Sequence, residues 1–129
     1  MEYECRTAIP RGTSAFARGY LECAEWVGLT DEDRKGFDDS SSPEWEDESV
    51  KSAKRMCSAF QEEAGALLNG LSSSQAGHDL FLTQNHHGAG FWDRGLGEVG
   101  DRLTRIAHSY GSVDVFFDPD SEKLSLYGC

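Results

Sequence analysis

Apolar residues recur at spacings of three and four in three segments, which predicts three amphipathic helices. The first helix is expected over residues 13–28, with Thr13 or Ser14 as its N-cap. The second is expected from residue 42 or 47 to 70, and the third from 99 to 110. The second helix has the longest apolar stripe, which consists of Val50, Ala53, Cys57, Phe60, Ala64, Leu67 and Leu68.

The pattern changes to strand-like segments in the second half of the chain. Residues 113–117 and 124–126 alternate between apolar and polar positions, with a turn sequence at 118–121 between them. Residues 78–84 are rich in strand-forming side chains, and 89–93 are interpreted as a second strand after a turn at 85–88. The element order α-α-β-β-α-β-β predicts an α+β fold, a small antiparallel sheet with helices packed on one face.

Length and composition favour one globular domain. The chain of 129 residues is expected to form a helical half over about 13–70 and a sheet-containing half over about 77–127. Hydrophobic residues make up 38% and charged residues 27% of the chain. No apolar run approaches the roughly 20 residues of a membrane span, and residues 1–12 lack a signal-peptide core. We therefore expect a cytoplasmic protein.

The strong negative charge limits the possible partners. The formal net charge is −11 and the isoelectric point is near 4.6. Such a chain is a poor direct ligand for nucleic acid or anionic membranes, because phosphate contacts require basic groups. The charge favours docking onto a basic protein surface. Alternatively, it serves only to keep the protein in solution.

The acidic segment 29–49 is interpreted as a loop with two aromatic residues. Trp45 and Phe37 either pin this loop to the body of the domain or act as exposed anchors for a partner. The carboxylates that such a partner would meet are Asp38, Asp39, Glu44, Glu46, Asp47 and Glu48.

Three of the four histidines lie in the run GHDLFLTQNHHGAGFWDRGLG, residues 77–97. His78, Asp79, His87 and Asp93 have side chains that bind zinc or transfer protons. The run lacks HExxH, and the chain has no CxxC pair, so we expect neither a metal nor a cofactor. Two interpretations stay open: these side chains fix a hairpin by hydrogen bonds, or they form a metal or acid–base site.

The cysteines give no sign of a disulfide framework. Cys23 and Cys57 fall on apolar faces of predicted helices, which favours buried free thiols. Cys5 and Cys129 lie near the ends of the chain.

The stretch GHDLFLTQNHHGAGFWDRGLGEVGDRLTRIAHSYGSVDVFF resembles the second half of a family of small phage and prophage accessory proteins. Members carry a motif similar to GHDFWLTRNGHGAGFWDR, and FARGYLECAEW and CSAFQEEAGALL resemble their first two helices more loosely. This chain departs from the motif at Phe81, Gln84 and His86. The family is mostly uncharacterised, so the resemblance implies a phage setting and no catalytic residues.

These observations predict a phage-encoded acidic protein that binds and inhibits a host protein in the host cytoplasm. One example is an anti-CRISPR or other anti-defence inhibitor that acts as a DNA mimic on a CRISPR effector or nuclease. Trp92 is predicted as a further apolar anchor. The alternative is an enzyme that uses His78, Asp79, His87 and Asp93. The sequence leaves the oligomeric state open.

Overall fold

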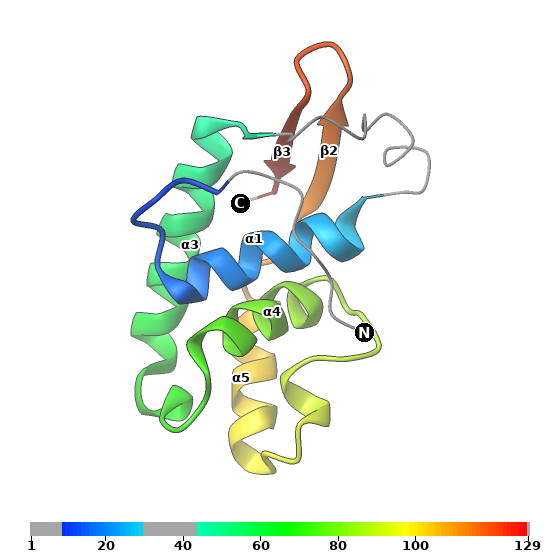
Figure 1. Cartoon of the computed structure of the whole chain (residues 1–129). Helices are drawn as coiled ribbons and strands as arrows, with labels where there is room; N and C mark the ends of the chain where they lie inside the picture. Colours follow the sequence, from blue (N-terminus) through cyan, green and yellow to red (C-terminus); the bar gives the residue numbers. More distant parts are fainter. Residues whose placement is uncertain (1–8, 30–43, 129) are drawn as a thin grey trace.

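The computed structural model describes residues 9–29 and 44–128, and these residues form an α+β fold, as expected. The helices surround a common core, and a small sheet lies at one end (Figure 1). None of the described helices is long and apolar enough to cross a membrane. The elements are α1 (Ala15–Gly28), β1 (Glu44–Trp45), α3 (Asp47–Ala64), η1 (Gly65–Leu68), α4 (Ser73–Gln84), η2 (Phe91–Asp93), α5 (Glu98–His108), β2 (Asp114–Asp118) and β3 (Lys123–Tyr127).

The three helices expected from the periodic pattern are confirmed as α1, α3 and α5. Ser14 caps α1, since its hydroxyl accepts a hydrogen bond from the Ala17 amide at 3.2 Å. The helix α3 begins at Asp47, the later of the two expected starts. It ends at Ala64 because Gly65 turns the chain with φ +51°, and η1 continues towards the expected end.

The strand predicted over residues 78–84 is wrong, because this segment is the second half of helix α4. Leu80, Phe81, Thr83 and Gln84 are all buried, so the segment lacks the polar face that would mark it as helical. The strand predicted over residues 89–93 is also wrong. These residues lead into the short 3₁₀ helix η2, so the predicted first hairpin does not exist.

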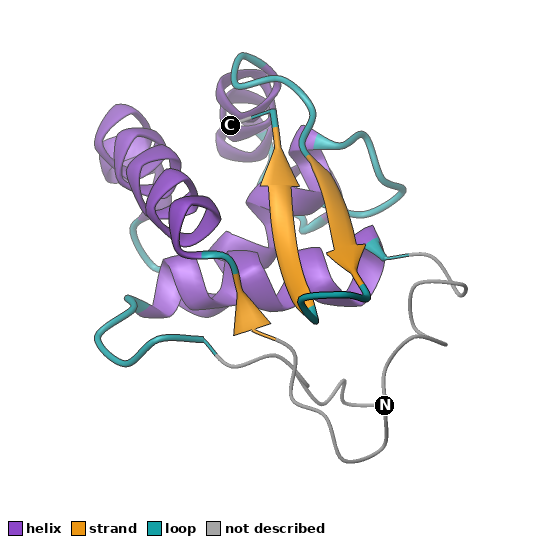
Figure 2. Cartoon of the chain, turned by 90° about the horizontal axis from the view of Figure 1, so that it is seen from above, coloured by secondary structure: helices purple, strands orange, loops and turns teal. Residues whose placement is uncertain are grey.

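The sheet has three strands in the order β1-β3-β2 and is mixed, not antiparallel throughout. Strands β2 and β3 form the predicted hairpin, with Val115 opposite Leu126. Strand β1 runs parallel to β3, with Trp45 opposite Leu124. Figure 2 shows the three strands from the side away from the helices, which cover the other face as predicted.

Trp45 pins the start of α3 to the domain. Its side chain is only 3% exposed and belongs to the hydrophobic core. The same region is fastened by the Glu46 amide, which donates to the Leu124 carbonyl at 2.8 Å. Next along β3, the Leu126 amide donates to the Ser49 hydroxyl at 2.9 Å. The prediction that Trp45 pins the acidic segment is thus confirmed, whereas Phe37 lies outside the described residues.

The closest contact between helices joins α1 to α4, and glycine makes it possible on both sides. A Cβ atom on Gly77 would collide with the Phe16 carbonyl of α1. A Cβ atom on Gly19 would collide with the Ser74 carbonyl of α4. Because the obstructing atoms belong to the backbone, rotation of a side chain cannot relieve either collision. The figure places the two helices side by side across the middle of the molecule (Figure 1).

Aromatic rings join the remaining helices to this pair. The Phe60 ring of α3 lies 6.0 Å from Phe16, 5.7 Å from Phe91 and 6.1 Å from Tyr110, measured between ring centroids. Phe60 therefore contacts rings from α1, from η2 and from the turn after α5. Such ring pairs add stability beyond that of apolar burial alone.

We expect Gly77→Ala to lower the free energy of unfolding by about 1–3 kcal/mol or more, since the added methyl group must push α1 and α4 apart. Gly88→Ala is the matched control, because a Cβ atom there meets no atom within 4 Å. Urea unfolding of the two variants and the parent measures both effects. Equal stability of the two variants would show that the α1–α4 contact tolerates a side chain.

Candidate functional site

The run of residues 77–97 extends over most of α4, a loop and η2, and it ends at the N-cap of α5. Its polar side chains were predicted to meet across a hairpin, and this arrangement is absent. The contacts that the structure does form decide whether the run is a site or a structural element.

Asp79 forms an ion pair with Arg94 across the loop. The Arg94 Nη2 atom lies 2.8 Å from Asp79 Oδ1, and its Nε atom lies 3.2 Å from both carboxylate oxygens. Gln75 also donates to Asp79 Oδ1, at 3.1 Å. The hydrogen bonds to Asp79 raise the pKa of the Arg94 guanidinium. The Asp79 carboxylate, 5% exposed, thus fastens the segment after η2 to helix α4.

Two further side chains hold the loop itself. Asp93 Oδ1 accepts a hydrogen bond from the Gly90 amide at 3.0 Å, and Thr83 Oγ1 accepts one from the Phe91 amide at 3.1 Å. Gly90 lies so close to Thr83 that a Cβ atom there would collide with the Thr83 hydroxyl. These contacts place the Phe91 ring in the core.

Asn85 connects the end of α4 to the sheet. Its Nδ2 atom donates to the Phe81 carbonyl at 2.9 Å, and its Oδ1 atom accepts from the Val113 amide at 2.8 Å. The residue thus caps the helix and positions the segment that leads into β2.

The histidines of the run lie in different environments. His78 is half-buried on α4, with Nε2 at 3.9 Å from a Glu22 carboxylate oxygen. His87 is exposed, and its ring lies 6.3 Å from Phe81 between centroids. His86 pairs with His108 at 4.4 Å. Among residues 9–29 and 44–128, no group of three or more His, Cys, Asp or Glu side chains is placed to hold a metal ion.

The structure thus brings Asp79, Asp93 and Thr83 into internal contacts that order the loop. It does not assemble His78, Asp79, His87 and Asp93 into one metal centre. These contacts favour the structural interpretation of the motif over the acid–base one, because the Asp79 carboxylate is already taken up by Arg94.

Cys23 and Cys57 are buried free thiols, as predicted. Burial, with a smaller contribution from the charge of Asp79, raises the pKa of Cys23 to about 12. A thiol in this state is a poor nucleophile, since the thiolate is the reactive form. Cys5 and Cys129 lie outside the described part of the chain.

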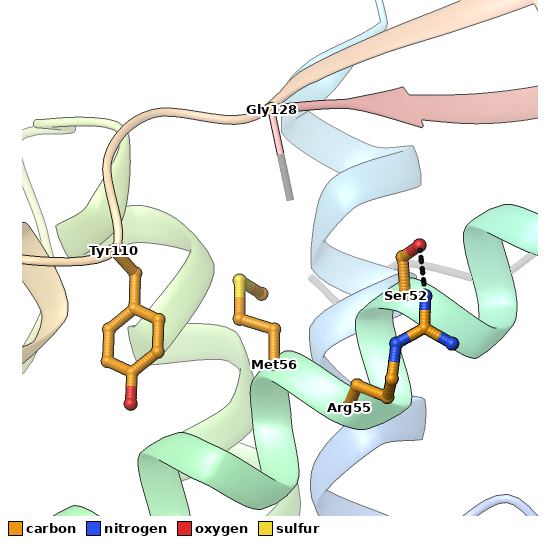
Figure 3. Close-up of a pocket in the computed structure, with 5 residues that line it drawn as sticks. All are labelled: Ser52, Arg55, Met56, Tyr110 and Gly128. Atoms are coloured by element: carbon orange, nitrogen blue, oxygen red, sulfur yellow. Dashed lines mark hydrogen bonds between the residues drawn. The ribbon is translucent and has the colours of Figure 1, made fainter.

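A hollow of about 400 Å³ lies between α3 and the end of α5 (Figure 3). Arg55 on its wall donates to the Ser52 hydroxyl at 3.2 Å. The Tyr110 hydroxyl donates to Glu63 at 3.2 Å, and burial is the main cause that raises the pKa of this phenol. The hollow therefore offers one exposed guanidinium and no base beside a nucleophile, which is weak support for catalysis.

The residues predicted to bind a partner fall into two separate places. Glu44, Glu46, Asp47 and Glu48 are exposed around the start of α3, whereas Asp38 and Asp39 lie outside the described residues. Trp92 is 51% exposed on η2. Because η2 lies beside α5, at the end of the molecule away from the β2–β3 turn, Trp92 does not join the acidic group (Figure 1). Trp45 is not an exposed anchor, since it belongs to the core.

The sheet face that points away from the helices carries two aromatic residues that were not predicted. Phe116 and Tyr127 are 51% and 59% exposed, and their rings meet edge to face at 4.9 Å between centroids. The sequence of β2 contains an indication of this pair. Phe116 alternates with the inward-facing Val115 and Phe117, so its side chain points outward.

Carboxylates surround this aromatic pair. One hollow is lined by Asp114, Phe116, Asp118 and Tyr127, and a second hollow is lined by Glu46, Glu48 and Tyr127. Tyr127 lines both, so the two hollows adjoin at this residue. We call the two together the acidic–aromatic surface, defined by Glu46, Glu48, Asp114, Phe116, Asp118 and Tyr127.

Comparison of the chain with models of protein families, with curated proteins and with solved structures found no match.

We expect Arg94→Gln to destabilise the protein by about 1–3 kcal/mol, because it leaves the buried Asp79 carboxylate short of donors. Asp79→Asn in the same chain should restore part of this loss. The control is Arg102→Gln, which breaks an exposed helix pair with Glu98 and should cost about 0.5 kcal/mol or less. Denaturant unfolding of all variants checks the prediction, and equal losses for Arg94→Gln and Arg102→Gln would contradict it.

Burial lowers the pKa of His78, against the opposing effect of Glu22. The unfolded chain takes up this proton near the usual histidine pKa of about 6.5, and the folded chain takes it up at lower pH. Stability should therefore fall as the pH drops through this window, and His78→Gln should lose less stability than the parent. Denaturant unfolding of the parent and the variant from about pH 7.5 to about pH 5.5 measures how steeply each free energy of unfolding changes with pH. An NMR titration midpoint for His78 above the usual value would contradict the prediction.

Proposed function

We propose that this protein is an acidic binding protein that docks onto a basic surface of another protein. The observation that carries the proposal is the acidic–aromatic surface, in which an exposed aromatic pair lies among carboxylates on the sheet face that points away from the described helices. Aromatic residues are enriched at interface hot spots, because they bury large areas on binding. Carboxylates around them would steer a cationic partner towards the same place.

The charge of the whole chain supports a basic protein as the partner rather than nucleic acid. The formal net charge of −11 repels phosphate and attracts a surface rich in Lys and Arg. Many basic protein surfaces bind nucleic acid, so an acidic protein that covers one would compete with nucleic acid for it. We therefore propose inhibition as the consequence of binding.

The resemblance to phage accessory proteins suggests which partner would be inhibited. In that setting the partner is a host protein, with a CRISPR effector or another defence nuclease as the leading example. The carboxylates of Glu46, Asp47 and Glu48 would then stand in for phosphate groups, as in a DNA mimic.

The enzymatic alternative receives less support from the described residues. Asp79 and Asp93 both hold the loop around η2 in place. His87 is exposed beside Phe81, and His78 faces Glu22 on the α1 side of α4. No observation favours a reaction at these side chains, so we propose none.

The test is affinity capture from a bacterial lysate, at low and at high salt, followed by identification of the bound chain. We expect a nucleic-acid-binding protein that is captured at low salt and lost with Glu46→Lys/Glu48→Lys. Glu62→Lys is the control, because Glu62 is exposed on α3 at a distance in sequence from the acidic–aromatic surface.

The captured protein is then purified, and its affinity for nucleic acid is measured with and without the acidic protein. Displacement of the nucleic acid supports the proposed function. Capture that persists in the Glu46→Lys/Glu48→Lys variant contradicts it, as does a partner that keeps its nucleic acid or a lysate from which nothing is captured.

A further inference from the structure

We infer that the acidic–aromatic surface recognises arginine side chains, and that its occupant is an arginine-bearing segment of the partner protein. This inference rests on the proposed function and assigns a side-chain chemistry to it. It starts from the geometry of Phe116 and Tyr127.

The two rings meet edge to face, so each covers at most one face of the other. They stand at 88° with their centroids 4.9 Å apart, which is an edge-to-face pair and not a stack. Both side chains are more than half exposed. Ring faces are therefore open to solvent, and the π-electron face is the part of an aromatic ring that attracts a cation.

A carboxylate is placed to form an ion pair with a cation that binds on these rings. Asp114 is directly opposite Tyr127 in the β2–β3 register, and it lies two residues from Phe116 on the same face of β2. Two residues along a strand are about 6.5–7 Å apart and their side chains project from the same face, so a guanidinium stacked on the Phe116 ring lies within side-chain reach of Asp114. A guanidinium over either ring can thus donate to Asp114.

Asp114 is available for this contact, whereas Asp118 and Glu44 each have a neighbour that competes for their charge. Asp118 is used by the turn, where it accepts hydrogen bonds from the Asp120 amide at 3.0 Å and the Ser121 hydroxyl at 3.1 Å. Lys123 lies opposite both Asp118 and Glu44 in the strand registers. Among the residues that the structure describes, none forms a side-chain hydrogen bond or ion pair with the Asp114 carboxylate, which stands in the strand register opposite Tyr127.

This combination favours arginine over lysine. A guanidinium is planar, so it can stack on a ring and present its edge donors to a carboxylate at the same time. An ammonium group is a compact and strongly hydrated point charge, which loses more hydration when it leaves water for an aromatic face. A surface of carboxylates alone would not distinguish the two residues.

A second copy of the chain is a poor occupant of the surface. In a twofold dimer through this face, Asp114 and Glu46 of one copy would approach the same carboxylates of the other. Like charges at such a contact oppose association. The charge therefore selects a cationic partner over self-association.

The test uses two fluorescent peptides of equal length and charge, which carry either arginine or lysine at every basic position. We expect the arginine peptide to bind about three- to tenfold more tightly at low salt, as a ring contact with a cation would give. Phe116→Leu should abolish this preference while it keeps an apolar side chain on the strand. Asp114→Asn should weaken both peptides and reduce the preference.

The control variant is Trp92→Ala, which removes an equally exposed aromatic residue far from the sheet and should leave the preference unchanged. Circular dichroism of Phe116→Leu and Tyr127→Leu shows whether each variant is folded, so either one suffices for the test. Equal binding of the two peptides would overturn the inference, as would a preference that survives both variants. A dimer that dissociates in Phe116→Leu, seen by sedimentation, would also overturn it.

The outcomes separate the inference from the proposed function. If both peptides bind equally and Glu46→Lys/Glu48→Lys abolishes their binding, arginine recognition fails while docking onto a basic surface stands. If neither peptide binds and the lysate yields no basic partner, both fail.

Discussion

The approach of α1 to α4 at Gly19 and Gly77 is the constraint on which the rest of the structure depends. Each glycine faces a carbonyl group of the opposite helix, so the two backbones touch directly. This contact fixes α4 in the middle of the molecule, where Leu80 and Phe81 are buried. The Tyr20 hydroxyl of α1 then donates to the buried Gln84 side chain at 2.7 Å, which closes the far end of the same pair.

The position of α4 also explains the polar motif that follows it. Asp79, Thr83 and Asn85 are spaced along this helix and its end, and each holds a different part of the chain: Arg94, the Phe91 amide and the Val113 amide. A helix buried on most sides needs polar side chains to receive the loops that surround it, since buried backbone donors must be satisfied. Residues 77–97 are thus rich in His, Asn, Asp and Gly because such residues hold the loops that surround a central helix.

Much of the fold could be predicted from periodicity, because the apolar residues of α1, α3 and α5 recur at helical spacing and α3 and α5 each have one buried and one exposed face. The β2–β3 hairpin was predictable for the same reason, from alternation and a strong turn sequence. Helix α4 was not predictable, since an apolar run without an exposed face is equally typical of a strand and of a buried helix. Its one local signal was Ser72 followed by Gln75, and the Ser72 hydroxyl does accept a hydrogen bond from the Gln75 amide at 3.4 Å. In the candidate site, the exposed carboxylates Glu44 to Glu48 were predictable from charge, whereas the pairing of Phe116 with Tyr127 depends on strand register.

The outer edge of β2 has a consequence for the behaviour of the protein at high concentration. Strand β3 is flanked by β2 on one side and by β1 and Ser49 on the other, whereas the outer edge of β2 has no strand beside it in the described residues. Such an edge is a template for strand addition and amyloid-like growth. Asp114 and Asp118 stand at the two ends of β2, where their charges oppose stacking of one molecule's edge on another's. We therefore expect the carboxylates on this strand to oppose edge-to-edge association, and their neutralisation to favour it.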